Sequence, residues 1–325
     1  MRVLLTGGTG FIGSRVLSRL LERGHQVNLV VNRTPPGVPE GPSVRHHHCD
    51  LKDPVNFRGA GFKAEAAINV AGQLRVAGIP DAQYWKVHYE ATKHVLEECA
   101  RFGLRRLVHV STTGVYGVTG KRPVAEEGPI RPSDIYERTK WEAERYAREY
   151  CSDGRIDLVV ARPALVYGPG DRHLLGLYRA IQGGYFRLIG DGSNLVHPIY
   201  IDDLVEGLLI CLERPEARGG TYNMVGEGPV TFRRFCEAIA SALGRPLPRW
   251  RIPRGAAMAA GFVLEGVRAV TGVGVPLTRD RVRFMSSDRA DDGGRARREI
   301  GFVAPTGLDE GVGRTVAWYR EKGWI

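Results

Sequence analysis

The chain has 325 residues, of which 43% are hydrophobic and 25% are charged, and its formal net charge at pH 7 is +10. This composition is that of an ordinary globular protein, long enough for two domains or one large α/β unit. The five cysteines are scattered without a C-x-x-C pair, so the sequence predicts neither a disulfide framework nor a zinc site.

The first predicted element is a short apolar strand at residues 2–6, and a helix over 11–23 follows it almost at once. Glycines at 7, 10 and 13 lie at the turn, in the pattern G-x-x-G-x-x-G. In such a turn the first glycine permits the tight bend, the second lets the backbone approach a pyrophosphate, and the third lets the helix pack close to the strand. Free N–H groups at the helix N-terminus also favour phosphate. The opening of the chain therefore predicts a nucleotide-binding loop.

Strands and helices then alternate, which favours an α/β fold with a Rossmann-type, doubly wound parallel sheet. The predicted strands lie near residues 26–31, 44–48, 66–70, 106–111 and 157–162, and the helices near 81–102 and 136–150. Residues 46–48 are three histidines on one predicted strand, where neighbouring side chains point to opposite faces. They do not converge on one ion, so no metal site is predicted.

Beyond about residue 165 the alternation weakens. Helices near 202–213, 231–243, 255–271 and 309–322 are separated by proline- and glycine-rich connections. We therefore expect an NAD(P)-binding domain at 1–165 and a smaller C-terminal substrate-binding lobe at 166–325, with some segments of the second half returning to the first domain.

The longest apolar stretch, residues 255–275, contains Glu265, Arg268 and several glycines. It predicts an amphipathic helix rather than a transmembrane one, so weak membrane association is the most that we expect. The arginines are dispersed, and the one run at 295–298 is typical of a solvated helix face, so no nucleic-acid partner is predicted. Because the first strand leads directly into the glycine loop, we expect no signal peptide and a cytoplasmic location.

The second group of candidate residues is Tyr136 and Lys140, which lie one turn apart on one face of a helix. A phenol, with a pKa of about 10, is a poor base at neutral pH, but a nearby ammonium and an oxidised nicotinamide favour the phenolate. Such a pair suits proton transfer at a carbinol carbon while a hydride moves to a cofactor. Upstream, the strand 106–111 ends in the hydroxyls of Ser111 and Thr112, at the edge where parallel sheets bind ligands.

Together these motifs resemble those of the extended short-chain dehydrogenases/reductases, a group that includes nucleotide-sugar epimerases and dehydratases and the 3β-hydroxysteroid dehydrogenases. The matching segments, in family order and at family spacing, are T-G-G-T-G-F-I-G at 6–13, C-D-L at 49–51, N-V-A-G at 69–72, V-S-T-T-G-V-Y-G at 110–117, Y-E-R-T-K at 136–140 and R-P-A-L-V-Y-G-P-G at 162–170. The resemblance runs nearly to the C-terminus.

The resemblance implies a role for each matching residue. Tyr136 would be the catalytic acid/base, Lys140 would hold the nicotinamide ribose and lower the phenol pKa, and Thr112 would hydrogen-bond the reacting oxygen. Ser111 would support the strand end and, like Tyr136 and Lys140, touch the cofactor. The other expected cofactor contacts are Gly7, Gly10, Phe11, Ile12, Asn32, Arg33, Asp50 and Leu51 (at the adenine), Ala71, Gly72, Pro163 and Val166 (near the nicotinamide).

The end of the second strand bears on the choice of cofactor. An NAD enzyme of this kind usually ends that strand in an acidic residue, which holds both ribose hydroxyls. Here that position holds Val31, and Arg33 follows within reach of a 2′-phosphate, to which an arginine fork can bind bidentately. Arg33 could equally be a solvated loop residue. NADP(H) is therefore favoured modestly, and NAD(H) stays open.

Departures from the family pattern narrow the reaction. Thr113 and Gly114 stand where the 4,6-dehydratases have Asp-Glu, so dehydration is not expected. Leu165 stands where nucleotide-sugar members tend to have Asn, and Val196 stands where they have an arginine that grips the diphosphate. Losing that arginine should cost about ten- to a hundredfold in affinity. Other arginines could compensate, and the candidates are Arg172, Arg187 and Arg251.

The segment N-L-V-H-P-I-Y-I-D-D at 194–203 and the apolar run 255–275 are similar to those of the 3β-hydroxysteroid dehydrogenase branch. An apolar helix over the pocket would suit a hydrophobic alcohol, although it could also serve lobe packing or a dimer face. His88 stands where the family usually has Asn. We expect it to tune the site, with a catalytic histidine as the alternative.

The sequence thus predicts an NAD(P)-dependent oxidoreductase for a secondary alcohol or ketone, with a hydrophobic, 3β-hydroxysteroid-like small-molecule substrate. The first alternative is a UDP-sugar 4-epimerase that uses the same three residues. A catalytically retired, cofactor-sensing protein is the alternative from another class, and the intact triad argues against it. The resemblance also implies a homodimer through the helices at 81–102 and 136–150.

Overall fold

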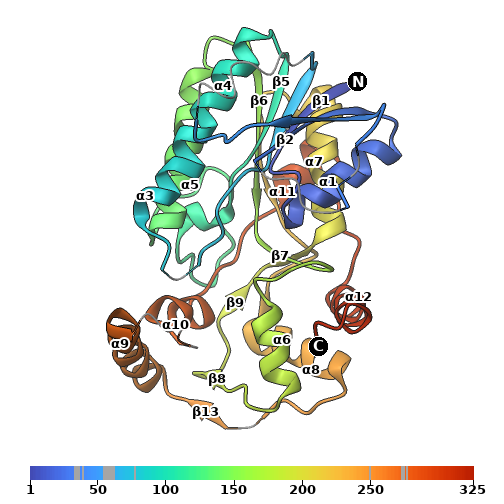
Figure 1. Cartoon of the computed structure of the whole chain (residues 1–325). Helices are drawn as coiled ribbons and strands as arrows, with labels where there is room; N and C mark the ends of the chain where they lie inside the picture. Colours follow the sequence, from blue (N-terminus) through green and yellow to red (C-terminus); the bar gives the residue numbers. More distant parts are fainter. Residues whose placement is uncertain are drawn as a thin grey trace.

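The computed structural model of the chain describes residues 1–32, 37–38, 40–53, 63–76, 78–248, 250–271, 275 and 277–325. These residues form an upper part, built on a central sheet, and a smaller lower lobe that holds the C-terminus (Figure 1). None of the described helices is both long and apolar enough to cross a lipid bilayer.

The upper part is built on a seven-stranded parallel sheet with the strand order β11-β6-β5-β4-β1-β2-β3. Its strands are β1 (Arg2–Thr6), β2 (Gln26–Val31), β3 (Val44–His48), β4 (Ala66–Asn69), β5 (Arg106–Val110), β6 (Asp157–Pro163) and β11 (Thr221–Met224). The order reverses between β1 and β4, which is where a doubly wound sheet opens a crevice at the carboxyl ends of its strands. The predicted Rossmann-type α/β fold is therefore confirmed.

Helices cover both faces of this sheet (Figure 1). One face carries α1 (Phe11–Glu22) and α7 (Ile201–Glu213), and the other carries α3 (Asp81–Tyr84), the π-helical turn η1 (Trp85–Glu90), α4 (Ala91–Arg101) and α5 (Ile135–Tyr150). Side chains alternate along β1, so Val3 and Leu5 join a core with α1 and α7, whereas Leu4 joins a second core with α4 and α5. A strand that is apolar at every position is thus buried on both faces, as a parallel sheet requires.

The lower lobe consists of short strands and peripheral helices. Its elements are β7 (Leu165–Tyr167), α6 (Leu175–Gln182), β8 (Leu188–Ile189), β9 (Leu195–Val196), β10 (Pro198–Tyr200), β12 (Val230–Thr231), α8 (Phe232–Leu243), β13 (Arg251–Ile252), α9 (Arg254–Thr271), α10 (Arg279–Ser286) and α12 (Leu308–Glu321). The short strands pair as β10 with β7, β12 with β9 and β13 with β8. The described residues also form η2 (Thr113–Tyr116), η3 (Pro215–Ala217) and α11 (Gly294–Ile300).

The structure adds elements that the sequence pattern did not predict. They include β11, which extends the main sheet beside β6, the helices α6, α10 and α11, and the short strands of the lower lobe. The helix expected over 81–102 is interrupted by η1, which contains the buried His88. A π-helical turn inside a helix often marks a functional site, because the extra residue redirects the side chains around it.

Candidate active site

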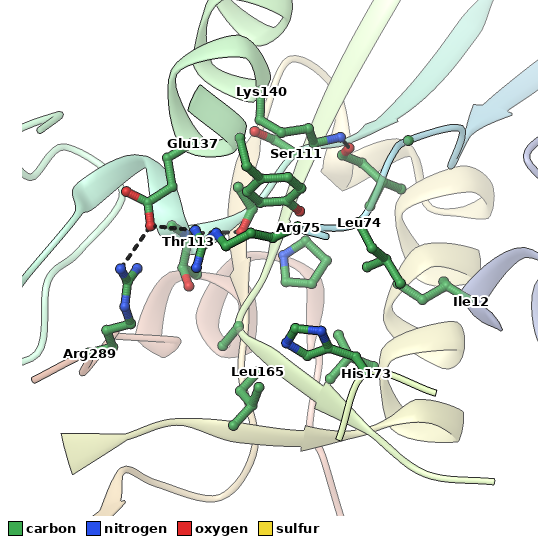
Figure 2. Close-up of a pocket in the computed structure, with 18 of the residues that line it drawn as sticks. Ile12, Leu74, Arg75, Ser111, Thr113, Glu137, Lys140, Leu165, His173 and Arg289 are labelled. Atoms are coloured by element: carbon green, nitrogen blue, oxygen red, sulfur yellow. Dashed lines mark hydrogen bonds and ion pairs between the residues drawn. The ribbon is translucent and has the colours of Figure 1, made fainter. Parts of the chain in front are cut away.

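A cavity of about 240 Å³ lies where the carboxyl ends of β4, β5 and β6 face the lower lobe. The segments after β5 and β6 supply Ser111, Thr112 and Ala164 to its wall, and α5 supplies Tyr136 and Lys140. Leu165 and His173 line it from the lower lobe (Figure 2). This position is the one at which open parallel sheets bind their ligands.

The glycine loop beside the cavity is shaped so that only glycine fits at two positions. Gly7 has a φ of +70°, and a Cβ there would lie 2.6 Å from the backbone nitrogen of Ala71. A Cβ on Gly13 would lie 2.1 Å from the carbonyl oxygen of Gly7, so the helix packs directly on the turn. At Gly10, by contrast, a Cβ would meet only the Gly7 oxygen, at 3.3 Å. The close packing below and the open side at Gly10 fit a dinucleotide pyrophosphate at the start of α1.

The expected adenine end lies at the tips of β2 and β3. Asn32 is exposed and its Nδ2 donates to Asp50 Oδ2 at 3.3 Å, while the backbone N–H of Lys52 donates to Asp50 Oδ1 at 3.0 Å. The Leu51 carbonyl lies 2.7 Å from His94 Nδ1. Arg33, on which the preference for NADP(H) rested, lies outside the described residues.

The expected nicotinamide end opens into the cavity. Of the predicted cofactor contacts, those that line the cavity are Phe11, Ile12, Gly72, Ser111, Tyr136, Lys140, Pro163 and Val166. Gly72 lies next to the catalytic candidates, because a Cβ there would be 3.7 Å from His88 Nε2 and 4.0 Å from Lys140 Nζ. The structure therefore brings one end of the predicted cofactor set together with the predicted triad.

The start of α5 positions the predicted acid/base. Asp134 caps the helix by accepting from the N–H of Glu137 at 2.8 Å, which fixes the first turn, where Tyr136 lies. Thr112 hydrogen-bonds Tyr136 and also accepts from the N–H of Gly114 at 3.0 Å. Burial raises the pKa of Tyr136, and the charge of Arg75 followed by the Thr112 hydrogen bond opposes that rise.

Lys140 follows one turn later with its ammonium group buried. Its Nζ donates to the carbonyl oxygen of Val110 at 2.5 Å, at the end of β5. Burial lowers the pKa of Lys140 to about 8, against the opposing charge of Glu144. The ammonium is therefore close to its titration range at physiological pH.

Both ring nitrogens of His88 face protein groups. Nδ1 lies 2.8 Å from Thr139 Oγ1, and Nε2 lies 3.0 Å from the backbone nitrogen of Gln73 and 3.1 Å from its carbonyl oxygen. Burial, followed by the charge of Lys140, lowers the pKa of His88 to about 3. These contacts indicate a positioning role, because both nitrogens of the neutral imidazole are engaged with protein groups.

Sequence reasoning missed two arginines at the site. Arg75 and Arg289 both line the cavity and converge on Glu137, which is fully buried (Figure 2). Glu137 lies inside the Y-E-R-T-K motif, and its place in sequence between Tyr136 and Lys140 is the signal that could have drawn attention to it. Although burial opposes it, the charge of Arg289 and then the hydrogen bonds of Ser133 lower the pKa of Glu137.

The apolar part of the wall also differs from expectation. Leu165, Val166 and Val196 line the cavity, together with Phe284 of α10. The described lining takes no residue from α9, so the described residues do not show the helix at 255–271 in the wall of this pocket. Instead α9 buries Ala257 and leaves Phe262 and Val263 more than half exposed, at 63% and 62%.

The arginines proposed as substitutes at the pocket do not line it. Arg172 packs over the ring of Trp324, with its Cζ 4.9 Å from the ring centroid, and Arg187 donates to the carbonyls of Gly184 and Phe186. These arginines therefore do not replace the diphosphate-binding arginine that nucleotide-sugar members have at the position of Val196.

Comparisons with known proteins agree with the geometry. Residues 3–225 match the NAD dependent epimerase/dehydratase family. The 2-alkyl-3-oxoalkanoate reductase of Stenotrophomonas maltophilia is 30% identical, over 98% of this chain and 99% of its own length. The decarboxylating sterol-4-alpha-carboxylate 3-dehydrogenase of Saccharomyces cerevisiae is 26% identical, over 98% of each chain. The structure of Thermus thermophilus UDP-glucose 4-epimerase in complex with NAD superposes with a TM-score of 0.79 at 25% identity, covering 98% of this chain and 99% of that one.

Proposed function

The chain belongs to the NAD dependent epimerase/dehydratase family of dehydrogenases, reductases and epimerases, and we propose that it is an oxidoreductase for a secondary alcohol or ketone. The observation that carries the proposal is the convergence of Thr112, Tyr136 and Lys140 on one cavity at the carboxyl ends of the strands. The proposed substrate is a hydrophobic alcohol of the 3β-hydroxysteroid type.

Each member of the triad has a distinct proposed task. Thr112 orients the substrate oxygen by hydrogen bonding, and Tyr136 takes up or delivers the proton of that oxygen. Lys140 holds the nicotinamide ribose and adds positive charge beside the phenol, and Arg75 supplies further positive charge there. When bound, the nicotinamide cofactor supplies the hydride acceptor or donor.

The cofactor is NADP(H) or NAD(H), and the sequence favours NADP(H) because β2 ends in Val31 rather than in an acidic residue. Replacing Arg33 by Ala should weaken NADP(H) binding selectively. An equal loss for NAD(H) would contradict a contact between Arg33 and the 2′-phosphate.

The apolar wall of the cavity supports a hydrophobic substrate. Leu165, Val196 and Phe284 offer carbon surface where a sugar would need hydrogen-bond partners. The relatives that act on alkyl-substituted oxoalkanoates and on sterol carboxylates are consistent with this choice. The alternative is a UDP-sugar 4-epimerase, which the likeness to the Thermus thermophilus enzyme favours.

The deciding experiment measures nicotinamide absorbance with NAD⁺ and NADP⁺ in parallel, against hydroxysteroids, aliphatic secondary alcohols and UDP-sugars. Reduced cofactor should accumulate with an apolar alcohol. Interconversion of a UDP-sugar without such accumulation would establish the epimerase instead. Tyr136→Phe should lower turnover at least about a hundredfold, whereas Tyr146→Phe on the same helix should not. Unchanged turnover in Tyr136→Phe would exclude Tyr136 as the acid/base.

The proposed assembly is a homodimer in the cytoplasm, formed through the helical segments at 81–102 (α3, η1 and α4) and 136–150 (α5). Partly buried rings on η1 and α5 support it, since the centroids of Tyr89 and Tyr146 lie 5.5 Å apart and those of Tyr146 and Tyr150 lie 5.9 Å apart. Light scattering tests it, and a monomeric mass at working concentration would exclude the dimer.

A further inference from the structure

Two guanidinium groups flank the proposed acid/base. Arg75 comes from the segment after β4, and its Cζ lies 5.4 Å from the ring centroid of Tyr136. Arg289 comes from the segment after α10, on the lower-lobe side (Figure 2). Both line the cavity and keep 27% and 19% of their side-chain surface exposed, respectively. Two residues 214 positions apart in sequence (75 and 289) thus bring positive charge to one wall.

Glu137 fixes the two arginines relative to each other. Its Oε1 lies 3.0 Å from Arg75 Nη2 and 2.8 Å from Arg289 Nη2, while its Oε2 accepts from the N–H and the hydroxyl of Ser133, each at 2.6 Å. Arg75 Nη2 also lies 2.5 Å from Asp134 Oδ2. The carboxylates therefore hold both guanidinium groups through one nitrogen each.

The remaining donors of these groups are not all used. The Nε atoms of Arg75 and Arg289 are buried, and neither has a hydrogen-bond partner among the described residues. A guanidinium presents five N–H donors in a planar fork that matches a carboxylate. Two guanidinium groups that are held in place on one wall and keep unpaired N–H donors form a suitable binding site for an anion.

The acidic side chains on the same wall are already engaged. Glu137 is paired with both arginines. Asp171 accepts from the backbone N–H groups of His173 and Leu174, and Asp291 is hydrogen-bonded by Thr113. None of these carboxylates therefore needs the remaining arginine donors.

We propose that Arg75 and Arg289 form a subsite for a carboxylate that the substrate carries next to its reacting carbon. The proposal rests on the proposed function of Tyr136. The Arg75 Cζ lies 5.4 Å from the centroid of the phenol ring, so an anion that Arg75 binds lies close to the reacting oxygen, as the carboxylate of a 3-hydroxy acid lies close to its hydroxyl. The diphosphate of a nucleotide sugar is separated from its 4-hydroxyl by the whole sugar ring, which is too far. The substrate class is therefore a 3-hydroxy or 3-oxo carboxylate whose apolar part contacts Leu165, Val166 and Phe284.

Three probes with one alkyl chain test the subsite: 3-hydroxydodecanoate, its methyl ester and 2-undecanol. Each is assayed by nicotinamide absorbance with NAD⁺ and with NADP⁺. The acid should exceed both neutral probes in kcat/KM by about ten- to a hundredfold, mainly through KM. Equal kcat/KM values for the three probes, or turnover of neutral alcohols alone, would overturn the subsite and leave the proposed function standing. Absence of turnover with these probes and with every alcohol of the wider panel would instead count against the proposed function.

Variants of Arg289 then test whether this residue causes the preference for the acid over the ester. Arg289→Met should bring the ratio of kcat/KM for the acid to kcat/KM for the ester close to one, and Arg289→Lys should give a ratio between that of Arg289→Met and that of the native protein. The control is Arg187→Met, which alters a lower-lobe arginine outside the cavity and should leave the ratio unchanged. A ratio that persists in Arg289→Met would overturn the assignment. Thermal unfolding of each variant confirms that it is folded, and the ratio in the unmodified protein tests the subsite even if Arg289→Met does not fold.

Discussion

The imidazole of His88 meets the ring of Tyr136 edge-on, with the ring centroids 5.3 Å apart and the planes at 84°. The same imidazole is bonded to Thr139 on α5 and to the backbone of Gln73. His88 therefore ties the segment that carries Arg75 to the helix that carries Tyr136. Its place in a π-helical turn is what directs it towards both.

This contact makes His88 a positioning residue whose loss should lower turnover. We expect His88→Ala to lower kcat about ten- to a hundredfold, because Tyr136 loses the ring that restrains it. His88→Asn, which keeps one hydrogen bond, should lose less. Since the pKa of His88 is about 3, the imidazole stays neutral from pH 5 to 9, and the pH profile of kcat should keep its shape in both variants. Loss of a limb between pH 6 and 7 in His88→Asn would mean that the histidine exchanges protons during turnover.

A second prediction concerns the packing of α1 on the glycine loop. In Gly13→Ala the new methyl group would lie 2.1 Å from the Gly7 carbonyl oxygen, so the loop must shift. We expect the free energy of unfolding to fall by about 1–3 kcal/mol and NAD(P)H affinity, measured by fluorescence titration, to fall with it. The control is Gly313→Ala within α12, where no atom lies within 4 Å of a new Cβ and stability should rise by about 0.5–1 kcal/mol. Equal effects at the two sites would refute the steric argument.

A third prediction concerns the buried ion pair between Arg162 on β6 and Glu144 on α5. Arg162 Nε and Nη2 donate to the two oxygens of Glu144 at 3.0 and 2.6 Å. Glu144→Gln leaves a buried guanidinium without its counter-charge and should cost about 3–5 kcal/mol of unfolding free energy, measured by urea titration. Glu142→Gln, which removes the partner of the exposed Arg145 on the same helix, should shift the urea midpoint little.

The stability lost in Glu144→Gln should depend on pH because the pKa of Glu144 is shifted. Burial raises this pKa, but the hydrogen bonds and charge of Arg162 outweigh burial and lower it to about 2, below the ordinary 4.5. A depressed carboxyl pKa contributes stability above pH 4.5, and that contribution is lost as the pH falls towards 2. The difference in unfolding free energy between the native protein and Glu144→Gln should therefore become smaller below pH 4.5. A difference that is constant down to pH 3 would contradict an ionic origin.

Much of the first half of the fold could be predicted from the sequence because strands such as β1 (R-V-L-L-T) are short, mostly apolar runs that end at a turn signal. β1, β2 and β3 have the residue ranges that were expected. β11 was missed because its residues, T-Y-N-M, carry no such pattern and its burial comes from pairing with β6. Sequence periodicity also cannot indicate a π-helical turn, since it inserts one residue into an otherwise regular helix.

The triad candidates could be found because they lie in contiguous motifs. Arg75 and Arg289 could not, because only the tertiary structure brings the segment after β4 and the segment after α10 together. Neither has a neighbour in sequence that marks it as functional. Only the tertiary structure shows that both contact Glu137, the residue next to Tyr136.

The last prediction is that the buried ammonium group of Lys140 lowers the stability of the fold. Burial lowers the pKa of Lys140 from 10.5 to about 8, so at pH 7 the folded protein holds a buried ammonium that the unfolded chain would leave in water. Between pH 8 and 10.5 the unfolded chain binds the proton and the folded protein does not, so stability from this group rises with pH. We expect Lys140→Met to abolish turnover. The same variant should raise the free energy of unfolding at pH 7 by on the order of 1–3 kcal/mol, and the loss of the hydrogen bond to the Val110 carbonyl should reduce this gain. Urea titrations at pH 7 and at pH 10 should show the gain shrinking at the higher pH. A variant that is less stable than the native protein at pH 7 would show instead that the buried ammonium is a net stabilising group.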